Sequence, residues 1–181
     1  ALGPDNEFRK DAMAKGLSVL EKINKQCLEE NIDAKGLAKE IYRSTAENSE
    51  DDQLAGMLVR SLLSAGIDTT VSAIGNLLWC FAENPEQFQF VKDDKSLVGN
   101  AVEESLRLTS PVKAFCRTSA KDTEVSGVTI KEGTKILCVL GSANTDPEVW
   151  RTPLKYDVNR RTIGHLALGV GVHNCVGQTL A

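Results

Sequence analysis

The sequence predicts a mainly α-helical protein with small β-hairpins, and three observations support this prediction. Apolar residues recur at helical spacing in several segments before residue 109. Short segments rich in valine, threonine and isoleucine follow between residues 115 and 140. The last fourteen residues, LGVGVHNCVGQTLA, form a glycine-rich turn that places Cys175 at the start of an expected helix. A long helix and this cysteine loop are therefore expected to organise the chain.

Two helices are predicted in the first part of the chain from the spacing of apolar residues. The first spans residues 8–31 and the second spans residues 36–45. The polar run 46–52 is expected to be a loop, in which Ser49 and Asp52 resemble a capping box for the next helix. Both helices are expected only to pack.

The third predicted helix is unusually long. It covers residues 52–83, on the order of 45 Å at 1.5 Å per residue, and Asn84-Pro85 ends it. Its centre reads SAGIDTT, where Gly66 weakens the helix and Asp68 is polar. For Thr69 taken alone, a hydroxyl bonded to a carbonyl one turn earlier explains the residue without any function.

Shorter elements are predicted between the long helix and the cysteine loop. They are helices over 85–92 and 96–108, extended chain over 111–117, and a β-hairpin that pairs 124–130 with 135–140. Glu104 and Arg107 in the second of these helices are, by themselves, an ordinary surface pair. A long irregular stretch begins at Ser142 and needs something to organise it.

Composition limits the class of protein. The 181 residues are 41% hydrophobic and 25% charged, as in an ordinary soluble globular chain. No uninterrupted apolar run approaches about 18 residues, and the first residues do not form a signal peptide. The net charge of −4 argues against nucleic-acid or membrane-surface binding. Cysteines without paired spacing, at positions 27, 80, 116, 138 and 175, indicate reduced thiols and a cytoplasmic location.

The cysteine loop has several interpretations. Gly169 and Gly171 allow backbone conformations that a side chain would block, and free N–H groups after Cys175 would favour a thiolate. A thiolate in such a loop, with room for a flat ligand, suits axial ligation of haem iron. The alternatives are a small buried hydrophobe, a zinc site with His165 and His173, and a cysteine hydrolase using His173. A nucleotide-binding loop fits poorly, because the third glycine of GxGxxG and a Walker lysine are missing.

The longer patterns favour the haem interpretation. GxGxHxCxGxxLA is filled at every fixed position and resembles the haem-binding signature of the cytochrome P450 family. Residues 65–69, AGIDT, resemble the oxygen-activation motif of the long distal helix in that family, and Glu104-Ser-Leu-Arg107 matches its ExxR motif. The resemblance implies a mainly α fold in which the distal helix and the proximal cysteine loop sandwich haem b.

The resemblance also implies roles for individual residues. Cys175 would be the iron ligand, and the remaining haem contacts would come from Gly169, Gly171, Gly177, Arg117 and His173. Asp68 and Thr69 would carry protons to dioxygen, beside a wall kept low by Ala65. Glu104, Arg107 and Arg160 would form a partly buried charge network that holds the proximal loop.

The substrate class rests on a finer resemblance. Residues 60–66 and 164–169 are similar to those of soluble bacterial cytochrome P450 enzymes that oxidise para-substituted aromatic acids. Under this reading Arg60 and Ser61 lie near a substrate carboxylate and Phe115 packs on the ring. The alternative for Arg60 is a solvated side chain on the helix surface.

The implied function is haem-thiolate monooxygenation, which consumes O₂ and hydroxylates or O-demethylates a small organic substrate. No flavin or nicotinamide fingerprint is present, so the resemblance implies a separate ferredoxin and an NAD(P)H-dependent ferredoxin reductase. The alternatives are a non-catalytic haem sensor or carrier and an inactive fragment of the enzyme.

Three departures from the family pattern are visible. Leu168 stands where phenylalanine is usual, which affects redox tuning, and Thr145 stands where arginine is common, with local consequences expected. Family members run to roughly four hundred residues, above the usual size of a domain. Residues 1–181 are therefore expected to be the C-terminal part of a single P450 domain, without its N-terminal half and extreme C-terminus.

Overall fold

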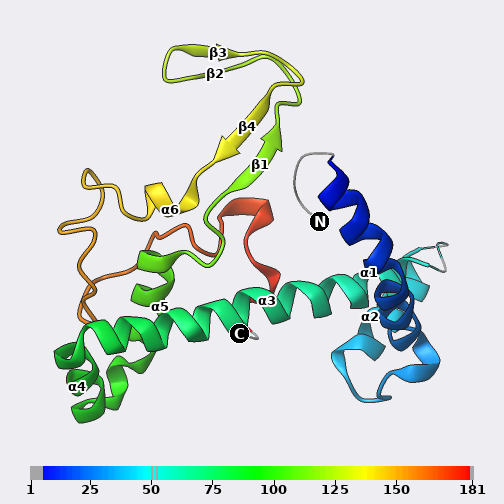
Figure 1. Cartoon of the computed structure of the whole chain (residues 1–181), viewed down its shortest axis with the longest axis horizontal. Coiled ribbons are helices and arrows are strands. Elements are labelled where there is room, and N and C mark those ends of the chain that lie inside the picture. The colour runs from blue at the N-terminus through cyan, green and yellow to red at the C-terminus, as the bar shows by residue number, and fades with distance from the viewer. Residues whose placement is uncertain (1–5, 50, 52, 180–181) are drawn as a thin grey trace. The chain divides into compact units, whose positions relative to one another are not determined.

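The structure is a computed structural model that describes residues 6–49, 51 and 53–179. It divides into two compact units, Ala1–Ile67 and Asp68–Ala181, and the division falls within the long helix α3 (Figure 1). Most of the regular structure is helical and the strands are short, which confirms the mainly α fold class.

The first helix, α1, spans Glu7–Gln26 and ends five residues before the predicted end at residue 31. The side chain of Asn6 accepts a hydrogen bond from the Arg9 N–H and caps its start. At the other end the N–H of Cys27 is shared between carbonyls of the last turn, and Leu28 is extended with φ −69° and ψ 147°. The chain then makes only a 3₁₀ turn, η1, at Glu29–Asn31.

The second helix, α2, spans Leu37–Asn48 and is longer than predicted. The predicted loop over 46–52 therefore begins only at Ser49. The Asn48 side-chain amide donates to the Ser44 carbonyl at 2.7 Å, one turn earlier in the helix. The Ser49 hydroxyl accepts from the N–H of Asp51 at 3.1 Å. Asp52, the other residue of the predicted capping box, lies outside the described residues.

The long helix α3 spans Leu54–Glu83, 30 residues, as predicted to within two residues at its start. By length and composition it is one helix that could cross a membrane: an 18-residue window has a mean hydropathy of 1.2, and 6% of that window is buried. A core helix of a soluble protein has the same composition, so this finding is weak evidence for a membrane span. Within the described part of the chain, α3 keeps large apolar side chains exposed, among them Val71, Leu78 and Trp79.

Two helices follow α3 closely in the second unit. Asn84 precedes α4, Pro85–Asp93, with Pro85 in the first turn, where its missing N–H and fixed φ suit a helix start. A 3₁₀ turn, η2 at Lys95–Leu97, leads into α5, Val98–Thr109. Both helices were predicted to within two residues at each end.

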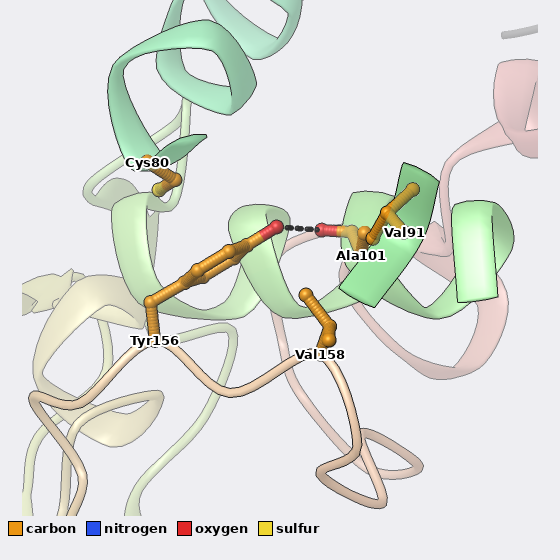
Figure 2. Packing of buried hydrophobic residues seen from close by; sticks show 5 residues of the cluster. All are labelled: Cys80, Val91, Ala101, Tyr156 and Val158. Carbon is orange, nitrogen blue, oxygen red and sulfur yellow. Dashed lines mark hydrogen bonds between the residues drawn. The ribbon is translucent and has the colours of Figure 1, made fainter. Parts of the chain in front are cut away.

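The core of the second unit joins these helices to the irregular chain beyond them (Figure 2). Cys80 of α3, Val91 of α4 and Ala101 of α5 pack with Tyr156 and Val158, and all five are buried. The Tyr156 hydroxyl donates to the Ala101 carbonyl at 2.9 Å, so the phenol is buried with its polar atom satisfied.

Two short ladders replace the predicted β-hairpin. Strand β1, Phe115–Thr118, pairs antiparallel with β4, Lys135–Cys138. Strand β2, Thr123–Val125, pairs antiparallel with β3, Val128–Ile130, and Figure 1 shows this hairpin beyond the end of the β1–β4 ladder.

The predicted pairing of 124–130 with 135–140 is therefore wrong. Ser126 and Gly127 both have positive φ, 50° and 76°, as in the two-residue turns whose twist matches that of paired strands. Residues 123–130 consequently fold back on themselves, and β4 is left to pair with β1.

The stretch after the short helix α6, Leu140–Ala143, is irregular as predicted. Side chains of α4 and α5 supply the hydrogen bonds that a regular element would make for itself. Gln87 accepts from the N–H of Val158 at 2.9 Å, and Asn100 donates to the carbonyls of Val158 and Arg160 at 2.5 and 2.8 Å. The irregular chain is thus fixed to two helices.

Tyr156→Phe should lower the free energy of unfolding by about 1 kcal/mol at pH 7, because it removes a buried hydrogen bond. Burial raises the pKa of Tyr156 above its usual 10.0. A raised pKa favours the folded state below the unfolded pKa, and this contribution is lost as the pH rises toward the folded value. Urea unfolding from pH 7 to 11 should therefore show the wild type losing its advantage above pH 10, whereas a constant difference between the two proteins would contradict this account.

Candidate functional site

The cysteine loop folds back on itself through two glycines in left-handed conformations. Gly169 and Gly171 have φ of 72° and 67°, as the sequence indicated. A Cβ on Gly169 would lie 3.2 Å from the His173 carbonyl oxygen, so a side chain would displace the loop. The Cys175 N–H donates to the Leu168 carbonyl at 2.8 Å and closes the turn.

The side chain of Asn174 makes further hydrogen bonds across the cysteine loop. Two carbonyl oxygens, those of Leu168 and Gly169, face one end of its side-chain amide at 3.1 and 3.0 Å, so that end is the NH₂ group and donates to both. Leu168, the residue that departs from the family pattern, therefore contributes its backbone to the loop whatever its side chain is.

The helix predicted after Cys175 is, in the described residues, only a 3₁₀ turn, η4, at Val176–Thr179. Leu180 and Ala181 lie outside the described residues. The N–H of Gln178 donates to the Cys175 carbonyl at 3.4 Å, as 3₁₀ geometry requires. Among the hydrogen bonds described for residues 53–179, none runs from a backbone N–H to the Cys175 sulfur, and the expected stabilisation of a thiolate by free N–H groups stays a prediction.

The surroundings of Cys175 suit a large apolar ligand. The thiol is exposed, and so are the nearby side chains of Val170, Val172 and Val176, with Val172 96% exposed. A Cβ on Gly177 would be in ordinary contact with Sγ at 3.7 Å, so glycine leaves space beside the sulfur. A thiol presented among uncovered apolar side chains fits a flat, mostly apolar group carrying a thiolate-binding metal.

The zinc alternative has no geometric support. Among the described residues, no group of three or more His, Cys, Asp and Glu side chains could hold a metal ion. His165 is instead 2.6 Å from the Glu103 carboxylate through Nε2 and accepts the N–H of Ala167 at Nδ1.

The charged network of α5 is more deeply buried than predicted. Arg107 and Glu104 form a bidentate pair, with Nε to Oε2 at 2.7 Å and Nη2 to Oε1 at 3.0 Å. Both side chains are 0% exposed. Arg160 adds its Nε to Glu104 Oε1 at 2.9 Å, so the predicted three-residue network is present.

The remaining N–H groups of the two arginines donate hydrogen bonds to the irregular stretch. Arg107 Nη1 donates to the carbonyls of Asn144 and Pro153 at 2.6 and 2.8 Å. Arg160 donates to a further set of carbonyls, those of Arg151, Thr152 and Lys155. The buried charges therefore organise the segment that leads to the cysteine loop.

The residues proposed for oxygen activation lie on α3. Asp68 and Thr69 belong to the second unit and Ala65 to the first, and all three are exposed. The exposed carboxylate of Asp68 is accessible to a substrate or to water.

The residues proposed for substrate binding make contacts within the chain. Arg60 Nη1 donates to the Asn24 side chain at 2.8 Å, so the guanidinium already has a hydrogen-bond partner within the chain. The Ser61 hydroxyl donates to the Met57 carbonyl at 2.8 Å, one turn earlier. A role in binding a carboxylate would compete with both bonds.

Arg117 and Phe115 lie on the same face of β1 and contact each other. The guanidinium carbon is 5.3 Å from the centre of the Phe115 ring, and both side chains are exposed. His173 lies in the 3₁₀ turn η3, Gly171–His173, and is exposed as well. These three side chains are available to a ligand.

Sequence reasoning missed the polar residues that fix the irregular stretch. Gln87, Asn100 and Asn144 are neutral, and their partners are 22 to 71 residues away in the sequence. The one available signal was that Asn144 directly precedes Thr145, a position at which this chain departs from the family pattern. The Thr145 hydroxyl lies 2.9 and 3.3 Å from the carbonyls of Gly141 and Ser142 in the preceding turn, and the local consequences expected of this departure stay a prediction.

Comparison with known proteins shows the family. A sequence model of cytochrome P450 matches residues 3–181. The chain is 43% identical over its whole length to cytochrome P450 CYP199A2 of Rhodopseudomonas palustris, of which it covers 44%. It is 38% identical to cytochrome P450-terp of a Pseudomonas species, covering 83% of this chain and 36% of the relative.

Solved structures agree. A crystal structure of CYP109E1 from Bacillus megaterium in complex with testosterone superposes with a TM-score of 0.84 at 27% identity, covering 98% of this chain and 49% of that one. The chain therefore belongs to the cytochrome P450 family, whose members bind haem b. It spans less than half the length of the curated relatives named above.

Glu104→Gln should lower the free energy of unfolding by about 3–5 kcal/mol, because it leaves the Arg107 charge buried without its counter-charge. Urea denaturation would measure the change. Lys131→Gln is the matched control, since it breaks an exposed ion pair with Asp122 and should cause no comparable loss. Equal losses in the two variants would contradict the structural role of the buried pair.

Proposed function

We propose that residues 1–181 are the C-terminal part of a single cytochrome P450 domain, and that the protein is a haem-thiolate monooxygenase with Cys175 as the iron ligand. The observation that carries the proposal is the exposed Cys175 thiol on a closed glycine loop, among uncovered apolar side chains. The family match over residues 3–181 supports it, as does the alignment to 44% of the length of a P450 relative.

Haem, when bound, supplies the iron centre at which dioxygen is activated. Cys175 would hold that iron from the proximal side, with its loop closed by the carbonyl of Leu168. Gly169, Gly171 and Gly177 would let the backbone lie close to the haem, because they carry no side chain. Exposed Arg117 and His173 would donate hydrogen bonds to the haem carboxylates.

Asp68 and Thr69 would move protons on the distal side. The overall reaction takes O₂, a substrate C–H bond, two electrons and two protons to an alcohol and water. The carboxylate of Asp68 is exposed and can exchange protons with solvent, while the Thr69 hydroxyl can relay a proton or position water. Ala65 leaves room beside them because its side chain is a single methyl group.

The proposed substrate is a small aromatic carboxylic acid, hydroxylated or O-demethylated. Residues 60–66 and 164–169 carry the resemblance that supports this class. Exposed Phe115 offers a ring face, and Arg60 offers a positive charge once its bond to Asn24 is exchanged for the substrate. Ser61 would add a hydroxyl near the same carboxylate.

The proposed electron source is a ferredoxin reduced by an NAD(P)H-dependent ferredoxin reductase, and the proposed location is the cytoplasm. The bacterial relatives named above and the absence of a flavin or nicotinamide fingerprint in the sequence support this assignment. We assign α3 to the P450 fold rather than to a membrane span, because superposition on a P450 crystal structure covers 98% of this chain.

An inactive fragment is the second candidate for the chain by itself. The specific observation in its favour is the apolar surface of α3, since Val71, Leu78 and Trp79 are more than half exposed in the described part of the chain. A haem sensor or carrier is the third, and the Asp68-Thr69 pair argues against it because a sensor needs no proton route.

Cys175→Ser should abolish thiolate ligation. Reduction of the haem-loaded protein under carbon monoxide should give a strongly red-shifted Soret band in the wild type, and Cys175→Ser should lose it because the thiolate donor is gone. Cys116→Ser is the matched control, since it removes another exposed thiol and should keep the band. A red-shifted band that survives Cys175→Ser would refute the ligand assignment.

Thr69→Ala should separate an enzyme from a sensor. Product formation from an aromatic acid should fall at least about tenfold while the carbon monoxide spectrum stays unchanged, because the change removes a proton relay and no haem ligand. Thr70→Ala, one position along α3, should keep its activity. Unchanged product formation in Thr69→Ala would remove Thr69 from the mechanism.

A further inference from the structure

Asn144 is a buried neutral residue at the start of the irregular stretch. It is 0% exposed and bonds to three separate parts of the second unit. Its backbone carbonyl accepts from Arg107 Nη1 at 2.6 Å. Its side-chain NH₂ donates to the Ser110 hydroxyl at 2.9 Å, and its Oδ1 accepts from the Leu166 N–H at 2.6 Å.

These bonds connect the buried ion pair to the cysteine loop. Leu166 in turn accepts from the Gly169 N–H at 3.0 Å, and Leu168 accepts from the Cys175 N–H at 2.8 Å. A continuous series of short hydrogen bonds therefore runs from Arg107 through Asn144 to the backbone of Cys175. This route is separate from the contacts of Arg160, whose donors go to Glu104 and to carbonyls of residues 151–155.

Few side chains could occupy this position. The site needs a donor for the Ser110 hydroxyl and an acceptor for the Leu166 N–H on one short, planar group, and a carboxamide supplies both. Ser110 also ends α5 in a left-handed conformation with φ 43°, and its hydroxyl bonds back to the Arg107 carbonyl at 3.2 Å. An apolar residue of similar size would leave the part-buried Leu166 N–H without this acceptor, and would leave the Ser110 hydroxyl with only its bond to the Arg107 carbonyl.

We infer that Asn144 is a positioning residue for the iron ligand: through its Oδ1 bond to the Leu166 N–H, it fixes the stem of the cysteine loop and thereby the place of Cys175. The inference rests on the proposed function, in which Cys175 binds haem iron. The hydrogen bonds of Asn144 can be measured by a readout that does not depend on haem, so the positioning step can be tested separately.

The first readout is amide hydrogen exchange in the haem-free protein. In the wild type the Leu166 amide should be protected, and Asn144→Leu should reduce that protection roughly tenfold or more because its acceptor is gone. Asn159→Leu, an exposed asparagine in the same stretch, should leave it unchanged. An unprotected Leu166 amide in the wild type would overturn the inference even if Asn144→Leu does not fold.

The second readout is the carbon monoxide spectrum of the haem-loaded protein. Asn144→Leu should bind haem but show a mixture of the red-shifted Soret band and the band of haem without thiolate, since the loop is no longer held. Ser110→Ala, which keeps the bond to Leu166, should resemble the wild type. A homogeneous red-shifted band in Asn144→Leu would overturn the positioning role, whereas no red-shifted band in the wild type would instead refute the proposed function.

Discussion

The buried pair of Glu104 and Arg107 is the interaction on which the rest of the second unit depends. Two charges at 0% exposure carry a large desolvation cost, which only close geometry and further hydrogen bonds offset. The bidentate contact supplies the geometry, and backbone carbonyls of the irregular stretch supply the hydrogen bonds. The pair and the stretch therefore depend on each other. The arginine N–H groups need the backbone carbonyls of the stretch as acceptors, and those carbonyls need the arginine as a donor.

This mutual dependence explains how a segment without regular structure can position the exposed Cys175 thiol. Residues between α6 and the cysteine loop lack a ladder or a helix, and side chains from α4 and α5 supply their partners. Tyr156 and Val158 add apolar burial at the same place. Asn144 extends the polar contacts from Arg107 to Leu166, next to the loop. The position of the cysteine loop is therefore set by the buried residues that hold the preceding stretch.

Much of this arrangement could be predicted from the sequence. Local signals located α3, α4, α5 and the two glycines of the loop, and a family pattern identified Glu104, Arg107 and Arg160 as partners. The β-pairing could not be predicted in the same way. Both Ser126-Gly127 and the segment 131–134 can form a turn, and only the backbone conformation shows which strands pair. The contacts of Asn144 could not be predicted from the sequence, since its hydrogen-bond partners are 22 to 37 residues away. After Cys175 the described chain forms a 3₁₀ turn instead of the expected helix, and the Gln178 N–H donates to the Cys175 carbonyl.

The central claim is that this fold presents Cys175 to an iron atom as a thiolate ligand. Iron K-edge X-ray absorption of the haem-loaded protein would test it most directly, because it reports the elements bonded to iron. The account predicts one sulfur neighbour beside the porphyrin nitrogens in the wild type, absent from Cys175→Ser and unchanged in Cys116→Ser. An iron atom with only nitrogen and oxygen neighbours in the wild type would contradict it.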